Sequence, residues 1–168
     1  MDSPITLRSP RYEDERGWFQ SSYDEVFPQC LWVMHNISQS VKNTIRGLNY
    51  QLPFAQHKLV TVLQGSITDI ILDVDPDSPS YGQWRKFKLS SDDEDLPNQL
   101  FVPSNYAHGF SVHSETAMVS YLADQAYHPY AEHSIHPLSS VLDLPWGVEV
   151  PIMSTKDTQA PNWSAVKV

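Results

Sequence analysis

The chain has 168 residues, 40% of them hydrophobic and 18% charged, and this length predicts one globular domain spanning residues 1–168. Eleven Lys and Arg residues against twenty Asp and Glu residues give a formal net charge of −9, which excludes the broad cationic surface of a non-specific nucleic-acid binder. The sequence has no apolar run of the ~20 residues that cross a membrane, no N-terminal secretory signal and a single cysteine, so we expect a cytoplasmic protein with neither a membrane partner nor an intrachain disulfide.

Short runs of β-branched and aromatic residues, separated by turn residues, predict the strands. The clearest runs are residues 58–63 and 67–74, and the intervening Gly65 predicts a hairpin turn between them. Further strands are expected near residues 83–89, 99–103, 107–112 and 117–122. Helical periodicity is nearly absent, so the predicted fold class is all-β, and many short strands fit a cupin-like jelly-roll barrel.

Two segments outside these strands are expected to be irregular. Residues 90–95 carry four carboxylates and predict a solvated loop. The segment after Leu138 is rich in Pro and Trp, and we expect it to wrap the barrel as an irregular C-terminal tail that has room for a short helix.

A series of short motifs is spread over almost the whole chain. In chain order they read DERGWF (14–19), NTIRGLNYQ (43–51), QHKLV (56–60), SPSYGQW (78–84), FVP (101–103), AHGF (107–110), SY (120–121), YHP (127–129) and STKD (154–157). Together, and in this order, they resemble the dTDP-4-dehydrorhamnose 3,5-epimerase family of cupin-like enzymes. The resemblance implies N-terminal strands that are exchanged within a homodimer, and a role in deoxysugar or cell-surface polysaccharide biosynthesis.

The resemblance also implies a reaction, inversion of C3 and C5 on either side of the C4 ketone of a dTDP-4-keto-6-deoxy sugar. Such chemistry needs a base for the proton next to the carbonyl, a cation or donor for the enolate oxygen, and an acid on the opposite face. By motif, Lys58 corresponds to the residue that meets the oxyanion, and Tyr121 corresponds to the acid. Asp157 corresponds to the carboxylate that supports the base.

Asn49 stands where the family's Arg-Gly-Leu-His motif has its histidine base. A carboxamide does not accept a proton near neutral pH, so Asn49 cannot act as the general base. Two interpretations follow. The chain is an epimerase acting at one or both carbons, with His108 or a water-mediated Asp157 as base, or it is a homologue that binds a nucleotide-diphosphate sugar without epimerising it. Ketoisomerisation on the same scaffold ranks last, because the His pair of such enzymes is absent.

The resemblance further implies residues that bind the substrate. Arg16, Arg46 and Lys156 lie in three separate motifs and would suit a diphosphate, because guanidinium and ammonium groups donate to anionic oxygens. Tyr127 corresponds to an aromatic residue beside the base. The other expected contacts are Asn36 and Glu132.

Strand alternation separates the histidines into inward and outward positions. If Lys58 and Asn36 point into the barrel, then His57 and His35 point outward, whereas His108 is expected to face the pocket. The sequence has no His-x-His pair, and the family it resembles is metal-free, so we expect neither a metal nor another cofactor.

Overall fold

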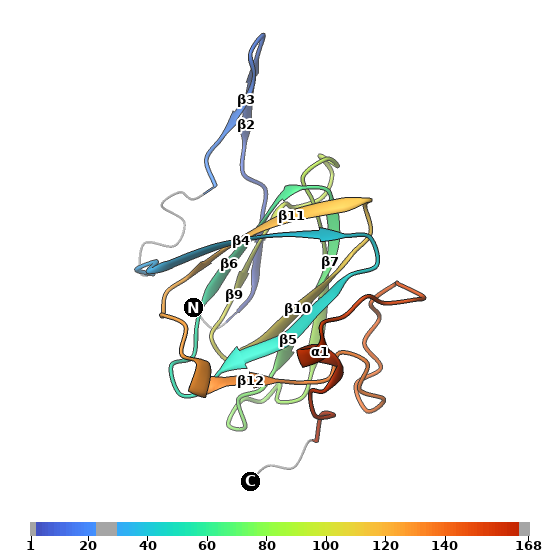
Figure 1. The fold of residues 1–168 in the computed structure, drawn as a ribbon. Coiled ribbons are helices and arrows are strands. Elements are labelled where there is room, and N and C mark those ends of the chain that lie inside the picture. The colour runs from blue at the N-terminus through green and yellow to red at the C-terminus, as the bar shows by residue number, and fades with distance from the viewer. Residues whose placement is uncertain (1–2, 23–29, 165–168) are drawn as a thin grey trace.

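Two five-stranded antiparallel sheets face each other in the computed structural model, which describes residues 3–22 and 30–164 (Figure 1). The first sheet has the order β1 (Ile5–Leu7), β9 (Gln99–Val102), β6 (Lys58–Gln64), β11 (Thr116–Ala123) and β4 (Met34–Val41). The second has the order β12 (Glu132–Ser134), β5 (Ile45–Gln51), β10 (Tyr106–Val112), β7 (Ser66–Asp73) and β8 (Trp84–Ser90). The all-β, cupin-like jelly-roll prediction is confirmed.

A separate hairpin of β2 (Arg11–Asp14) and β3 (Gly17–Gln20) projects away from the two sheets (Figure 1). Its aromatic side chains Tyr12, Trp18 and Phe19 are exposed. None of the helices in the described part of the chain is long and apolar enough to cross a membrane.

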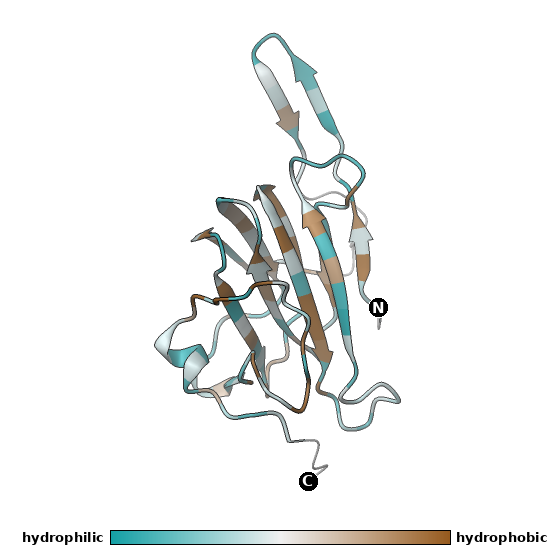
Figure 2. Ribbon diagram, turned by 90° about the vertical axis from the view of Figure 1, so that its right-hand side faces the viewer, coloured by the Kyte–Doolittle hydropathy of each residue, from teal (hydrophilic) through white to brown (hydrophobic). Residues whose placement is uncertain are grey.

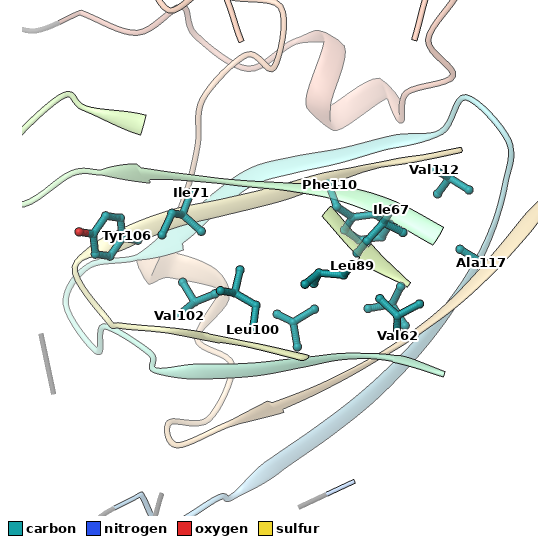
Figure 3. Close-up of a cluster of buried hydrophobic side chains, with 12 residues drawn as sticks. Val62, Ile67, Ile71, Leu89, Leu100, Val102, Tyr106, Phe110, Val112 and Ala117 are labelled. Atoms are coloured by element: carbon teal, nitrogen blue, oxygen red, sulfur yellow. The ribbon is translucent and has the colours of Figure 1, made fainter. Parts of the chain in front are cut away.

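The barrel core is built from the inward-facing residues of both sheets. On β6 the alternation of the strand turns Lys58, Val60 and Val62 to the interior, and Val60 and Val62 pack there with Ile71 and Phe110 of the second sheet. Figure 3 shows this cluster, in which the side chains of the two sheets interdigitate. Figure 2 shows hydrophobic bands alternating with polar ones along several strands, as a sheet buried on one face requires.

The predicted hairpin around Gly65 is wrong, although both of its strands exist. β6 pairs with β9 and β11 in the first sheet, whereas β7 pairs with β8 and β10 in the second. Gly65 therefore carries the chain from one sheet to the other. The alternating pattern predicts strands but does not state their partners, and a short Gly-bearing turn serves a hairpin and a sheet crossing equally well.

The C-terminal segment wraps the outer face of the second sheet, as predicted. Trp146 and Leu142 pack there with Ile70, in a cluster separate from the barrel core. The segment then returns to the barrel mouth, where Ile152 forms an isolated bridge with Thr44, and ends in the short helix α1 (Thr155–Thr158). The predicted acidic loop is also present, with residues 92–95 exposed.

Candidate active site

A cavity of about 720 Å³ lies between the two sheets at the end of the barrel that the C-terminal segment covers. Residues of β4, β6 and β11 form one wall, residues of β5, β10 and β12 form the opposite wall, and residues 152–157 complete the rim. The cavity brings together all of the predicted site residues except Arg16: Asn36, Arg46, Asn49, Lys58, His108, Tyr121, Tyr127, Glu132, Lys156 and Asp157.

Arg16 lies elsewhere, in the turn of the hairpin that projects from the barrel (Figure 1). Its side chain is 86% exposed and pairs with Asp14 at 2.5 Å. A single chain therefore does not bring Arg16 to the cavity.

The wall from the first sheet carries Lys58 and Tyr121. Tyr121 on β11 pairs with Asn36 on β4, so both side chains reach the same face. The hydroxyls of Tyr121 and Ser38 are hydrogen-bonded at 2.8 Å. The outward orientation predicted for His57 and His35 is confirmed, because these rings bond instead to Asp124 and Ser120 and do not line the cavity.

The opposite wall carries Asn49 and His108, which are direct cross-strand partners on β5 and β10. On its other side Asn49 pairs with Ser134, whose hydroxyl donates to Asn49 Oδ1 at 2.7 Å. One lone pair of the amide oxygen is engaged in this way, and the NH₂ group of Asn49 remains as a hydrogen-bond donor for a ligand.

His108 is paired with a carboxylate that sequence reasoning missed. Its Nε2 lies 2.8 Å from Oδ2 of Asp69, and the exposed fractions of the two side chains are 7% and 0%. Asp69 lies on β7 on the same face as Ile67 and Ile71. A carboxylate between Ile67 and Ile70 on a buried strand was the signal that could have identified it, since such groups are almost never fully buried unless paired.

A local irregularity of β5 turns both Arg46 and Asn49 toward the cavity. Residues three apart in a regular strand face opposite sides, but the register shifts between the pairs His108↔Asn49 and Phe110↔Arg46. Gly47 has a φ of +101°, and a Cβ at this position would lie 2.5 Å from the carbonyl oxygen of His108. Only glycine fits this close approach of the two strands.

Three predicted contacts at the rim are bonded to one another. Glu132 pairs with Lys156 at 2.5 Å and accepts a hydrogen bond from the Tyr127 hydroxyl at 2.8 Å. Asp157 is buried in α1, and its Oδ2 accepts a hydrogen bond from the Ser154 hydroxyl at 2.9 Å. Among the hydrogen bonds of the described residues there is none between Asp157 and Asn49.

Burial shifts the proton affinities of the two residues on the first wall. Desolvation lowers the pKa of Lys58 from its ordinary value of 10.5 to about 8, although attraction to Asp69 and Glu132 opposes this change. Desolvation raises the pKa of Tyr121 to about 12. At neutral pH the cavity therefore holds a cationic Lys58 and a protonated Tyr121. Within residues 3–22 and 30–164, no group of three His, Cys, Asp or Glu side chains is placed to hold a metal ion.

Comparisons with known proteins agree over almost the whole chain. The sequence model of the dTDP-4-dehydrorhamnose 3,5-epimerase family matches residues 2–165. A dTDP-4-dehydrorhamnose 3,5-epimerase of Shigella flexneri is 35% identical over 153 residues, which are 87% of this chain and 83% of that protein.

Two solved structures share the fold. The dTDP-4-dehydrorhamnose 3,5-epimerase of Bacillus anthracis, with TDP and PPi bound, aligns with a TM-score of 0.85 at 33% identity, covering 96% of this chain and 100% of that one. The Legionella pneumophila dTDP-6-deoxy-D-glucose-3,5-epimerase, in complex with dTDP-4-keto-L-rhamnose, aligns with a TM-score of 0.84 at 32% identity, covering 95% and 93%.

Proposed function

Because this chain belongs to the dTDP-4-dehydrorhamnose 3,5-epimerase family, we propose that it inverts one or both carbons beside the ketone of a dTDP-4-keto-6-deoxy sugar. The proposal is carried by one observation, the placement of proton-transfer and charge-stabilising groups on opposite walls of one cavity. Lys58 and Tyr121 come from the first sheet, and His108 and Asn49 come from the second. Inversion at carbon needs groups on both faces of the sugar ring, and this arrangement supplies them.

Lys58 is the group for the enolate oxygen. When a proton leaves a carbon next to the ketone, negative charge develops on the C4 oxygen, and a buried cation stabilises that charge more strongly than water does. Asp69 and Glu132 keep the ammonium charged at neutral pH in spite of its burial. The same ammonium contributes little to binding the neutral ketone, so its effect is concentrated on the step that forms the enolate.

Tyr121 is the acid that returns a proton from the other face. Burial raises the pKa of its hydroxyl to about 12, so the proton is present at every physiological pH. Its ring centroid lies 6.4 Å from that of His108, so the two side chains are within reach of a single sugar ring.

The dTDP moiety is proposed to lie toward the cationic rim. Arg46 donates through Nε to Ser40 at 2.9 Å, and its exposed guanidinium leaves donors for a diphosphate. Lys156 is held by Glu132, which fixes an ammonium at the same mouth of the cavity. The relative from Bacillus anthracis, which was solved with TDP and PPi bound, supports this ligand class.

Asn49 favours a second candidate, a protein that binds the nucleotide sugar without turnover. A donor at this position holds a sugar oxygen but cannot remove a proton. The two candidates differ in one observable, exchange of carbon-bound hydrogen with solvent.

The deciding experiment is incubation with dTDP-4-keto-6-deoxyglucose in deuterated water, followed by NMR at C3 and C5. We expect deuterium at one or both positions, and exchange no faster than in buffer at high protein concentration would refute the enzyme proposal for this substrate. Calorimetric titration with dTDP separates the remaining possibilities, because binding without exchange identifies the non-catalytic binder.

We further propose that two copies of the chain form a homodimer through their N-terminal strands. The exposed aromatic side chains of the β2–β3 hairpin and its projection from the barrel support this assembly (Figure 1). Arg16 does not reach the cavity of its own chain. In a dimer, the hairpin would bring Arg16 to the second copy, where it would contact the substrate as predicted. Sedimentation equilibrium tests the proposal, and a monomer at micromolar concentration would refute it.

A further inference from the structure

His108, one of the two candidate bases named from the sequence, lies in the cavity next to Asn49. His108 and Asn49 are cross-strand partners on β10 and β5, so their side chains leave the same face of the sheet side by side. Directly opposed Cβ atoms in antiparallel strands lie about 4.5–5.5 Å apart. The imidazole of His108 therefore lies one strand away from the place that a histidine side chain at position 49 would occupy.

The carboxylate of Asp69 fixes the tautomer of this imidazole. An ionised carboxylate only accepts hydrogen bonds, so the 2.8 Å contact places the ring proton on Nε2 of His108. The lone pair then lies on Nδ1, which has no hydrogen-bond partner among the described residues. A neutral imidazole oriented by a carboxylate, with its second nitrogen free, is the arrangement of a general base.

The packing around Asp69 does not offset the free-energy cost of burying its carboxylate. Its side chain is fully buried, and Oδ1 has no hydrogen-bond partner in the described part of the chain. An unsatisfied buried polar atom destabilises the fold, and an apolar residue would fit the surrounding strand, which reads Ile67, Thr68, Asp69, Ile70, Ile71. The carboxylate is explained if it orients and stabilises a histidine that becomes positively charged during reaction.

We propose that His108, oriented by Asp69, is the base that takes the proton from the sugar carbon. The proposal rests on the epimerase function proposed above. His108 is the catalytic residue, and Asp69 is a positioning residue that acts through it. Asn49 then serves as a donor to the substrate.

The proposed step balances within the residues of the cavity. The carbon–hydrogen bond breaks, its proton binds Nδ1 of His108, and its electron pair forms the carbon–carbon double bond of an enolate whose oxygen faces Lys58. Tyr121 gives its proton to the opposite face of the carbon as the ketone re-forms. The resulting imidazolium and tyrosinate return to their starting forms by exchanging protons with water.

The test compares two His–Asp pairs of this chain that have the same nitrogen–oxygen distance. His108–Asp69 lies in the cavity, whereas His57–Asp124, also 2.8 Å, lies on the other face of the first sheet. We expect His108→Asn to lower the rate of deuterium exchange by about 10²–10⁴-fold, while the control His57→Asn stays within about threefold of the unmodified chain. Titration with dTDP checks that the pocket of each variant is intact, and added imidazole should restore part of the exchange in His108→Ala.

Asp69→Asn provides a second arm that does not depend on the folding of the His108 variants. We expect kcat to fall by roughly 10–100-fold with KM unchanged, because a positioning residue alters the base and not the bound ketone. Unchanged exchange in His108→Asn, or unchanged kcat in Asp69→Asn, would overturn the assignment while leaving the epimerase function in place. No exchange in the unmodified chain would overturn the function itself.

Discussion

Replacing Lys58 by Met should make the protein more stable and less active at neutral pH. The ammonium of Lys58 lies in the cavity wall, and burial lowers its pKa from 10.5 to about 8. Methionine fills a similar volume without a charge to desolvate. Under the proposed function the charge of Lys58 serves the enolate and not the fold, so stability and activity should change in opposite directions.

The size of the effect follows from linkage between protonation and unfolding. Between pH 8 and 10.5 the unfolded chain holds a proton on Lys58 that the folded chain has lost, so stability rises with pH across this window. Below pH 8 the full cost of burying the charge is present, roughly 3 kcal/mol. The difference in unfolding free energy between Lys58→Met and the unmodified chain should therefore shrink by about 2 kcal/mol from pH 7 to pH 9.5.

Urea unfolding at a series of pH values measures this difference in unfolding free energy. The contributions of the other titrating groups cancel in the difference, because both proteins contain them. The control Lys86→Met changes the same side chain at an exposed site of β8, and its difference should not vary with pH. Activity supplies the second readout. We expect kcat of Lys58→Met to be about 10²–10³-fold lower. We expect kcat of the unmodified chain to decline above about pH 8, as Lys58 loses its proton. A pH-independent difference for Lys58→Met would refute the reasoning.

Three further changes test other parts of the site. Tyr121→Phe removes the proposed acid but leaves the proposed base, so deuterium should still enter the substrate while inversion, followed by NMR of the product, falls by about 10²–10⁴-fold. Equal loss of exchange and inversion would contradict the separate roles. Ser154→Ala removes the cap that accepts a hydrogen bond from the Asp157 backbone at 3.1 Å, and urea unfolding should show a loss of about 1 kcal/mol. Gly47→Ala places a Cβ 2.5 Å from the His108 carbonyl oxygen, whereas at Gly17, where φ is also positive, the space is open. Gly47→Ala should therefore lower the free energy of unfolding by at least ~2 kcal/mol more than Gly17→Ala. Equal shifts in thermal unfolding would show that the strand contact is unimportant.

The sequence predicted which side of a strand each residue faces better than it predicted which strands pair. Alternation predicted that Lys58 and His57 face opposite sides of the strand, as they do, because side-chain direction along a strand is a local property. The same reasoning wrongly paired the strands on either side of Gly65, because the choice of neighbouring strand is decided by contacts distant in the sequence. The motifs led to the cavity residues, but the contacts between those residues came only from the structure.

The pair formed by His108 and Asp69 illustrates the limit most clearly. The two residues are thirty-nine positions apart and become diagonal neighbours only through the register of β7 and β10. The carboxylate among apolar residues was visible in the sequence, yet its partner was not. Similarly, the bond between Ser134 and Asn49 depends on β12, a three-residue strand too short for its pattern to predict.

The position of residues 152–157 at the rim has a consequence for the order in which the site is assembled during synthesis. All strand pairs of both sheets are contained in the chain up to Ser134, but the cavity rim includes Ile152 and Asp157, which leave the ribosome later. The hydrogen-bonded barrel can thus form before residues 152–157 close this side of the cavity. A ligand that contacts both the strands and residues 152–157 therefore gains its full set of contacts, and its full stabilising effect, only when these residues are in place.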